Sequence, residues 1–211
     1  PRPLGPFHVR PLGLGCMNLS HAYGVPPPPE QGERLLRAAL DAGVDFFDTA
    51  ALYGFGANER LVGRVLGADR RRIVLASKGG MTGQPVGEGG ALQRVIDGRP
   101  GSIRRDCEDS LRRLGTEVID LYYLHRWDKA VPIEESVGAM AELLRAGKVR
   151  ALGLSEVSAQ TLRRAHREHP IAALQTEYSP WTRNPEIAVL QACHELGVAF
   201  VAFSPVGRGA L

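Results

Sequence analysis

The sequence contains no apolar run long enough to cross a membrane, and it has very little cysteine. No stretch of about 18 apolar residues occurs, so no transmembrane helix is expected. The first residues, Pro1–Pro6, lack the apolar core of a secretory signal, although the chain does not begin with Met. The three cysteines, Cys16, Cys107 and Cys193, lie far apart, which indicates reduced thiols in a cytoplasmic protein rather than a disulfide framework.

A large net charge and metal-binding clusters are also missing. The formal net charge is only +3 and 44% of the residues are hydrophobic, which excludes a wholly disordered chain. Acidic residues are mixed with the basic ones, and the longest basic run is Arg70–Arg72, so a solvated surface is favoured over a nucleic-acid site. No Cys-x-x-Cys and no His/Cys cluster has zinc spacing, so no metal is expected. The expected partner is a small molecule, with homo-oligomers left open.

What the sequence does show is an alternation of amphipathic helices with apolar, β-rich runs. Five helical stretches end at a glycine, which tolerates the left-handed backbone that often follows a helix: Gly43, Gly67, Gly115, Gly147 and Gly197. The runs are almost continuously apolar, which is typical of strands buried on both faces of a parallel sheet. The seven predicted strands are Leu12–Met17, Asp45–Ala50, Ile73–Lys78, Ile119–His125, Val149–Ser155, Ala172–Ser179 and Ala199–Pro205.

Six helices are predicted between these strands. Two of them carry apolar residues at intervals of three or four, which form one helical face: Ile103, Cys107, Leu111 and Leu114 in the first, and Val137, Met140 and Leu144 in the second. Asn184 followed by Pro185 predicts the N-cap and the first turn of another helix. The Gly-rich segment Gly79–Pro100 is the longest one expected to be irregular, and such a loop is usually functional or mobile.

This alternation predicts a parallel sheet with right-handed crossovers, either doubly wound or closed into a barrel. A dinucleotide-binding doubly wound sheet needs Gly-x-Gly-x-x-Gly after its first strand, but Asn18 stands where the third glycine is required. We therefore expect an α/β protein, with residues 1–211 forming a single (β/α)8 TIM-barrel domain. Seven strands leave a barrel open at two edges, so we expect a chain truncated after strand seven that lacks the C-terminal part.

Polar residues stand at the carboxyl ends of several predicted strands. Asp48, Lys78 and His125 each end an apolar run, and Tyr53 follows Asp48 in the next loop. Taken singly, each has a structural explanation, such as a turn cap, a solvated strand end, a core histidine or loop packing. In a barrel, however, these ends share one mouth. We therefore predict an active site in which Asp48 and Lys78 pair, because burying either charge alone is costly.

The chemistry of such a set is proton donation to an oxygen. A tyrosine with an ordinary pKa of about 10 is a poor acid near neutrality. The Lys78 ammonium, held by Asp48, is expected to lower the pKa of Tyr53 by favouring the phenolate. His125 can polarise a carbonyl oxygen through a hydrogen bond, as hydride reaches the carbonyl carbon. The hydride has to come from a cofactor, since no side chain supplies one.

Several segments resemble the aldo-keto reductase superfamily, in order and over essentially the whole chain. They are Phe46–Gly54 (FFDTAALYG), Ser77–Gly80 (SKGG), Tyr122–Arg126 (YYLHR), Gly153–Glu156 (GLSE), Gln175–Ser179 (QTEYS) and Phe203–Gly209 (FSPVGRG). Leu124–Met140 is similar to the pyridoxal-reductase-like and bacterial branches. The resemblance implies NADPH-dependent reduction of aldehydes or ketones to alcohols. It assigns this to Tyr53 as the general acid, with Asp48, Lys78 and His125.

The resemblance also implies that NADP(H) lies extended across the barrel mouth. Ser155 and Gln175 would bind the nicotinamide carboxamide, with Glu156 where many members have Asn. Phe203 would stack on the ring, which needs the aromatic face and not a hydroxyl. The cofactor site would continue through Ser204, Pro205 and Val206 to Gly207 and Arg208, where the loop would wrap the pyrophosphate. NADPH rather than NADH rests on the resemblance alone, because the family's 2′-phosphate site lies beyond Leu211.

Substrate recognition is expected to use an apolar and aromatic pocket. Met17, Tyr23 and Trp127 are the residues predicted to line it, with Trp127 placed just after His125. Their structural alternative is loop packing. Cys16, near the mouth, is expected to be a buried structural thiol.

Two other functions remain open. A Schiff-base barrel enzyme would use Lys78 as its nucleophile, which requires a neutral lysine that Asp48 opposes. A non-catalytic, NADP(H)-sensing regulatory subunit is known among reductase-like barrels. The presence of all four residues of the predicted catalytic tetrad weighs against it: Asp48, Tyr53, Lys78 and His125.

Overall fold

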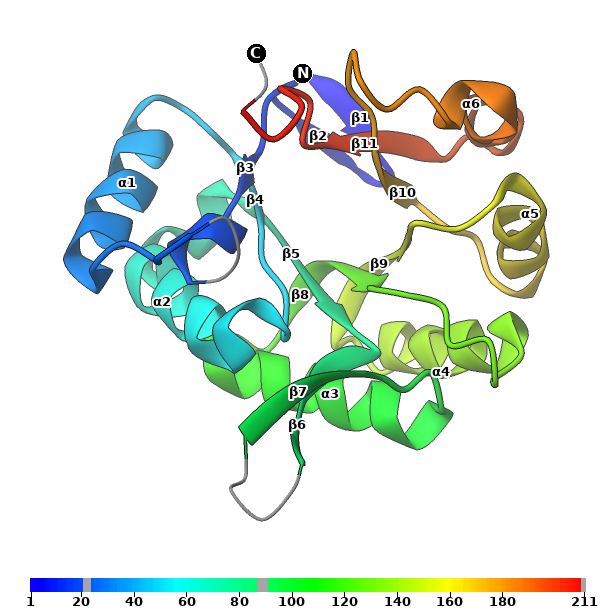
Figure 1. The fold of residues 1–211 in the computed structure, drawn as a ribbon, viewed down its shortest axis with the longest axis horizontal. Coiled ribbons are helices and arrows are strands. Elements are labelled where there is room, and N and C mark those ends of the chain that lie inside the picture. Colours follow the sequence, from blue (N-terminus) through cyan, green and yellow to red (C-terminus); the bar gives the residue numbers. More distant parts are fainter. Residues whose placement is uncertain (21–23, 87–90, 210–211) are drawn as a thin grey trace.

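The computed structural model describes residues 1–20, 24–86 and 91–209. At its centre, seven parallel strands form one sheet that curves into an incomplete barrel (Figure 1). The strands are β3 (Leu14–Gly15), β4 (Phe46–Asp48), β5 (Val74–Gly79), β8 (Ile119–Leu124), β9 (Val149–Ser155), β10 (Ala173–Glu177) and β11 (Ala199–Phe203), in the order β11-β10-β9-β8-β5-β4-β3. All seven predicted strands are confirmed, several of them shorter than expected.

Within the described residues, six α-helices alternate with these strands and cover the outside of the sheet (Figure 1). They are α1 (Pro29–Asp41), α2 (Ala57–Leu66), α3 (Pro100–Leu114), α4 (Ile133–Arg145), α5 (Ala159–Glu168) and α6 (Pro185–Leu196). Three 3-10 helices join them: η1 (Met17–Leu19), η2 (Tyr53–Gly56) and η3 (Gly67–Arg72). The two predicted apolar faces on α3 and α4 pack into the core between helices and sheet, with Leu144 only partly buried. Strand, helix and layer order thus confirm the predicted α/β-barrel class.

The predicted cap of α6 is only partly right. Pro185 lies in the first turn as expected, and Asn184 occupies the N-cap position. However, Asn184 already has helical backbone angles, φ −51° and ψ −34°, and its side chain makes no capping hydrogen bond among the described residues. A capping side chain usually needs an extended backbone to reach the amides of the first turn.

The expectation that Gly79–Pro100 is irregular is wrong for most of its described residues, while residues 87–90 lie outside the part that the structure describes. The strands β6 (Met81–Val86) and β7 (Ala91–Ile96) form an antiparallel hairpin, paired from Met81 with Ile96 to Val86 with Ala91. Their Gly, Pro and Gln content gives little local strand signal. The hairpin depends on tertiary contact: a Cβ on Gly83 would lie 2.1 Å from the ring of Phe55, so this glycine lets the strand rest against η2.

A second, unpredicted hairpin closes the amino end of the barrel. The strands β1 (Arg2–Leu4) and β2 (Phe7–Val9) pair antiparallel. Leu4 and Val9 pack with the inward-facing side chains of the sheet, including Leu121 and Tyr123. The interior is therefore apolar at this end, whereas the buried polar residues Asp48, Lys78, His125 and Ser155 lie at or near the opposite, carboxyl ends of their strands.

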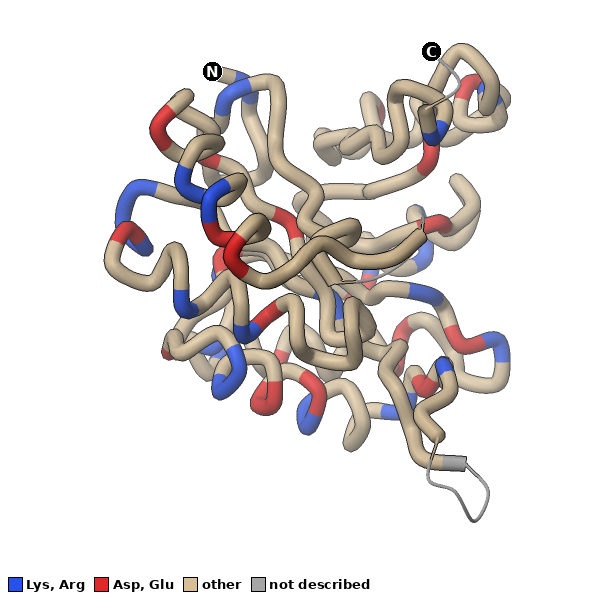
Figure 2. Tube along the Cα trace, turned by 60° about the vertical axis from the view of Figure 1, so that its left-hand side comes forward, with Lys and Arg blue, Asp and Glu red and all other residues tan. Residues whose placement is uncertain are grey.

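The outer surface has no single dominant charge. Figure 2 shows Lys and Arg interleaved with Asp and Glu along the outer helices. Ion pairs such as Arg164 with Glu134 and Arg104 with Glu142 join neighbouring helices. In the described ranges, no helix is both long and apolar enough to span a membrane.

We expect the same glycine-to-alanine change to have opposite effects in two helices. In α4, a Cβ on Gly138 would meet only a Glu168 carboxylate oxygen at 3.7 Å, so Gly138→Ala should raise the free energy of unfolding by ~0.5–1 kcal/mol. In α2, a Cβ on Gly63 would lie 2.3 Å from the Leu114 carbonyl oxygen. Gly63→Ala should therefore force α2 away from α3 and cost ~1–3 kcal/mol. Urea unfolding would measure both; equal effects would contradict the close packing of α2 on α3.

Candidate active site

Four elements deliver the predicted tetrad to one end of the barrel. Asp48 is the last residue of β4, Lys78 lies on β5, His125 directly follows β8, and Tyr53 begins η2. The relative exposures of Asp48, Tyr53, Lys78 and His125 are 8%, 8%, 1% and 5%, so all four are buried. The insertion of the β6–β7 hairpin does not separate them, because β5 pairs directly with β8, with Lys78 opposite Tyr123.

Lys78 is the centre of this cluster. Its ammonium forms an ion pair with Asp48 Oδ1, and Nζ also donates to the Thr49 carbonyl oxygen at 2.9 Å and to the Tyr53 hydroxyl oxygen at 3.2 Å. These three acceptors match the three protons of the ammonium. The structure thus contains the predicted ion pair and directs the remaining donor of Lys78 at Tyr53.

The second oxygen of Asp48 is also occupied. Gln175 Nε2 on β10 donates to Asp48 Oδ2 at 2.8 Å. Gln175 was expected only as a partner of the carboxamide, and the structure places it on the tetrad as well. The carboxylate thereby joins a cation and an amide from opposite sides of the barrel.

Tyr53 and His125 border the same space. Their ring centroids are 5.8 Å apart, with the rings nearly perpendicular at 85°. The His125 backbone amide donates to the Gly79 carbonyl oxygen at 2.9 Å, which extends the β5–β8 pairing to this residue. The two rings are in edge contact, so the phenol and the imidazole lie next to each other at this end of the barrel.

The predicted lowering of the Tyr53 pKa is wrong as a net effect. Burial raises the pKa of Tyr53 above its ordinary value, and this outweighs the opposing pull of the Lys78 ammonium. Burial alone would lower the pKa of Lys78, but attraction to Asp48 and Tyr53 raises it overall. At neutral pH Tyr53 therefore keeps its proton and Lys78 keeps its charge.

Sequence reasoning missed a buried polar clamp around Asn58 on α2. Asn58 is fully buried; its Nδ2 donates to the Cys16 carbonyl oxygen at 2.8 Å, and its Oδ1 accepts from Thr49 Oγ1 at 2.6 Å. The Cys16 amide in turn donates to the Asp48 carbonyl oxygen at 2.8 Å. The clamp joins the ends of β3 and β4, and it fixes the residue whose carbonyl receives Lys78.

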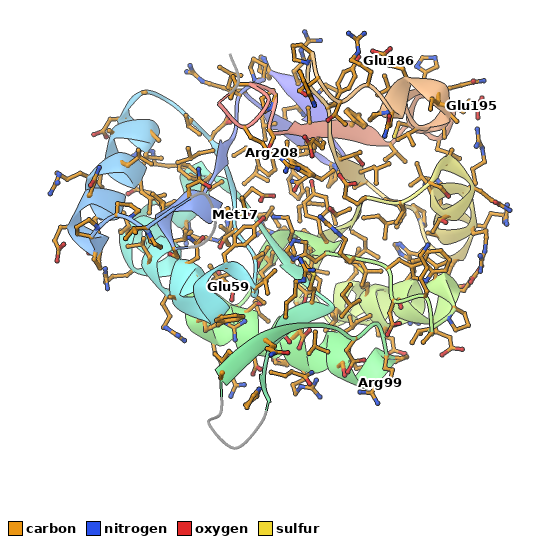
Figure 3. All side chains as sticks on the ribbon, in the orientation of Figure 1. Met17, Glu59, Arg99, Glu186, Glu195 and Arg208 are labelled. Carbon is orange, nitrogen blue, oxygen red and sulfur yellow. The ribbon has the colours of Figure 1, made fainter. Side chains whose placement is uncertain are left out.

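A second buried group, Glu59, also lacked a sequence signal. Glu59 on α2 (Figure 3) is fully buried and accepts hydrogen bonds at 2.5 Å from Ser77 Oγ and from Arg113 Nε. Ser77 directly precedes Lys78, so this network ties β5 to α2 and α3 behind the cluster. Polar helical residues such as Asn58 and Glu59 look like solvent-facing residues in the sequence, and only the fold shows them buried.

The three predicted substrate residues have different surroundings. Met17 is half-buried and packs against the cluster that contains Tyr53. Trp127 donates from its indole nitrogen to the Val131 carbonyl oxygen at 2.9 Å and packs against the outer core, with Lys129 Nζ 3.9 Å from its ring centroid. These are the contacts that the loop-packing alternative predicts for Trp127. Tyr23 lies outside the described residues.

Cys16 is a buried thiol, as predicted. It has no exposed surface, and burial raises its pKa to about 12, so it carries no thiolate at neutral pH. Within the described ranges, no group of three or more His, Cys, Asp or Glu side chains could hold a metal ion.

The predicted cofactor residues lie at or near the carboxyl ends of β9, β10 and β11. Ser155 is buried at the end of β9, and its Oγ accepts from Arg126 Nη1 at 3.0 Å. Glu156 has a left-handed φ of +56°, and its carboxylate accepts from the Glu177 amide at 2.8 Å. Gln175 lies beside both on β10, where its carbonyl oxygen accepts from the Glu156 amide at 3.0 Å. These residues lie beside one another because β10 pairs with β9 in register, with Gln175 opposite Ser155.

The loop after β11 turns tightly at the same end of the sheet. Phe203 is half-buried, Pro205 and Val206 are exposed, and the Gly207 amide donates to the Ser204 carbonyl oxygen at 3.0 Å. Ser204, Gly207 and Arg208 all have left-handed φ angles, of +49°, +60° and +59°. Arg208 (Figure 3) forms an ion pair with Glu177 at 2.5 Å. The guanidinium expected at a pyrophosphate is therefore held by a carboxylate here.

Comparison with known proteins identifies the family. The model of the aldo/keto reductase family matches residues 11–211. The chain is 46% identical over 204 residues to probable aldo-keto reductase 1 from Glycine max, covering 96% of this chain and 58% of that protein's length. The chain therefore belongs to the aldo/keto reductase family, while spanning about three-fifths of this relative.

Solved structures agree in fold. An aldo-keto reductase from Bacillus halodurans in its holo form superposes with a TM-score of 0.87 at 34% identity, over 99% of this chain and 67% of that one. An aldo-keto reductase from Klebsiella pneumoniae, in complex with NADPH, gives 0.76 at 32% identity, over 93% of this chain and 64% of that one. The incomplete barrel seen here thus corresponds to part of their (β/α)8 fold.

We expect Lys78→Met to lower the free energy of unfolding by ~3–5 kcal/mol, because the Asp48 carboxylate would stay buried without its cation. Adding Asp48→Asn should restore part of this loss, since neither charge then remains, and Asn keeps an acceptor for Gln175. Urea unfolding of the wild type, both single variants and the double variant measures the coupling. A double variant less stable than Lys78→Met alone would show that the two groups act independently.

The same pair predicts how stability depends on pH. Because the pKa of Lys78 is raised in the folded state above its ordinary value of 10.5, its contribution is complete below that value and is lost as the pH rises through the folded-state pKa. We expect the difference in unfolding free energy between wild type and Lys78→Met to be constant through the neutral range and to shrink only in strong alkali. A difference that disappears in mild alkali would contradict a protonated Lys78.

Proposed function

We propose that the protein containing this chain reduces an aldehyde or ketone to an alcohol, with NADPH as the hydride donor and Tyr53 as the general acid. The observation that carries the proposal is the Lys78 ammonium, which forms an ion pair with Asp48 and donates to the Tyr53 oxygen at 3.2 Å. The cluster lies at the carboxyl end of the strands, where barrel enzymes carry their chemistry. Membership of the family supports the same reaction class.

Tyr53 is arranged to donate its proton away from Lys78. Because the ammonium has only donors, the Tyr53 oxygen accepts from Nζ, and its own proton points elsewhere. When that proton moves to a carbonyl oxygen, the phenolate forms 3.2 Å from a positive charge that is already in place. Burial keeps the proton on Tyr53 until the substrate oxygen becomes basic enough to take it.

The other two members support this step. Asp48 holds the Lys78 ammonium in position and keeps it charged. His125 borders the space in front of Tyr53, with its ring centroid 5.8 Å from that of Tyr53, and orients the carbonyl oxygen by hydrogen bonding. Tyr53 would supply the proton to the carbonyl oxygen, while the hydride for the carbonyl carbon would come from NADPH when it is bound.

The residues present fit NADP(H). Ser155 and Gln175 offer a hydroxyl and an amide side by side for the carboxamide, and Phe203 offers a half-buried ring. The left-handed φ angles of Ser204, Gly207 and Arg208 fold the loop after β11 tightly at this end of the sheet, where the pyrophosphate would lie. The complex of the Klebsiella pneumoniae relative with NADPH supports the same cofactor. We also propose a cytoplasmic location, for which the buried free thiols are the supporting feature.

The Schiff-base alternative is disfavoured by the same geometry. A nucleophilic lysine must be neutral, whereas Lys78 is held charged by Asp48 and has three acceptors around Nζ. No observation favours the cofactor-sensing subunit over the enzyme. An experiment that measures NADPH binding and carbonyl turnover separately distinguishes the sensing subunit from the enzyme.

We expect Tyr53→Phe to lower kcat for reduction of 4-nitrobenzaldehyde by roughly 100- to 10,000-fold, because the proton donor is lost, while NADPH binding is retained. The loss of NADPH absorbance measures turnover, and quenching of protein fluorescence measures binding. The matched control is Tyr122→Phe, since the Tyr122 hydroxyl is buried on the outer side of β8 with no hydrogen-bond partner among the described residues. That variant should remain active.

Retained turnover in Tyr53→Phe would exclude Tyr53 as the acid. Tight NADPH binding by the wild type without turnover of a broad carbonyl panel would favour the sensing subunit. Covalent trapping of a carbonyl compound on Lys78 by borohydride would favour the Schiff-base enzyme.

A further inference from the structure

Arg126 reaches from the end of β8 to the end of β9, next to the predicted carboxamide site. Its Nη1 donates to Ser155 Oγ at 3.0 Å and to the carbonyl oxygen of its neighbour His125 at 2.6 Å. Ser155 is only 1% exposed, and Arg126 is itself half-buried. A partly buried guanidinium is costly unless its N–H groups are hydrogen-bonded, and these two contacts satisfy Nη1.

The carboxylate next in sequence does not take this guanidinium by hydrogen bonding. Glu156 directly follows Ser155, but its left-handed φ of +56° accompanies a side chain whose Oε1 accepts from the Glu177 amide at 2.8 Å. Arg126 is therefore left to contact the serine hydroxyl rather than the neighbouring acid. The contact joins the residue after His125 to the predicted cofactor site.

The chemistry of the guanidinium determines the direction of the hydroxyl. Arginine has five N–H donors and no acceptor, so Ser155 Oγ must accept in this contact. The single proton of the hydroxyl then has to point away from Arg126. Among the described residues, no side chain accepts it, so it is available to a ligand acceptor in front of β9.

The Gln175 amide is oriented by a similar argument, but it is left with an acceptor where Ser155 is left with a donor. The ionised Asp48 carboxylate can only accept, so the group that contacts it at 2.8 Å is Nε2, and the amide oxygen of Gln175 faces the other way as an acceptor. Gln175 stands opposite Ser155 in the pairing of β10 with β9. The strand ends therefore present one donor and one acceptor side by side.

We propose that Arg126 is a positioning residue that fixes Ser155 as a donor and thereby orients the nicotinamide carboxamide. The inference rests on the proposed function. A carboxamide has one acceptor oxygen and one donor nitrogen, so a site with a fixed donor and a fixed acceptor binds it in a single orientation. The carboxamide oxygen would then face Ser155, and its nitrogen would face Gln175.

A double-mutant cycle at full natural length tests this, using Arg126→Met, Ser155→Ala and the double variant. We expect each single variant to bind NADPH roughly tenfold more weakly, as for one lost hydrogen bond in a buried site. Because Arg126 acts through Ser155, the double variant should bind no more weakly than Ser155→Ala alone. The dissociation constant from fluorescence quenching is the readout, so no turnover is needed. Penalties that multiply in the double variant would overturn the inference.

Two controls separate positioning from general damage. The affinity for 2′,5′-ADP, which lacks nicotinamide, should be unchanged in Arg126→Met, and an equal loss for both ligands would overturn the inference. Arg126→Lys keeps a charged donor without an acceptor and should retain most of the NADPH affinity, whereas a loss equal to that of Arg126→Met would count against it. Failure of the wild type to bind NADPH would refute the proposed function itself. Binding by the wild type with independent penalties would refute only the role of Arg126.

Discussion

The ion pair between Lys78 and Asp48 is the constraint on which the site depends. Two opposite charges lie at the end of an otherwise apolar barrel, where neither is tolerated alone. The neighbouring polar groups hydrogen-bond to these two charges. The Thr49 carbonyl and the Tyr53 hydroxyl accept from the Lys78 ammonium, and the Gln175 amide donates to the Asp48 carboxylate. The strands β4, β5 and β10 therefore all contribute to this buried ion pair, since they carry Asp48, Lys78 and Gln175.

Much of the fold and the centre of the site could be predicted from sequence because parallel barrels obey strong rules. Nearly continuous apolar runs identified all seven strands, since such runs suit strands buried on both faces. Once the strands are parallel, their carboxyl ends meet, and the polar residues at those ends become neighbours without further information. Asp48, Lys78 and His125 come together for this reason, although they are far apart in the chain.

What could not be predicted depends on contacts that only the folded chain creates. The β6–β7 hairpin has weak strand residues and is held by packing on Phe55. The pKa of Tyr53 reflects a balance in which burial exceeds the effect of a neighbouring charge, and a sequence shows the charge but not the depth. Asn58 and Glu59 lie on an outer helix, where polar residues usually face water, so their burial has no local signature.

The contact between Gly83 and Phe55 has a consequence for how this barrel can diverge. Connections between a barrel strand and its following helix usually vary freely among relatives, because little else depends on them. Here the β6–β7 connection packs on Phe55, which is only two positions beyond Tyr53. Phe55 has a left-handed φ of +50°, a strained backbone angle that its surroundings maintain. An insertion or deletion in β6 or β7 would thus be transmitted to the tyrosine without altering any of the four clustered side chains. In this chain, the β6–β7 hairpin belongs to a class of connections that usually vary in sequence and length, yet it packs against the segment that carries the proposed acid, Tyr53.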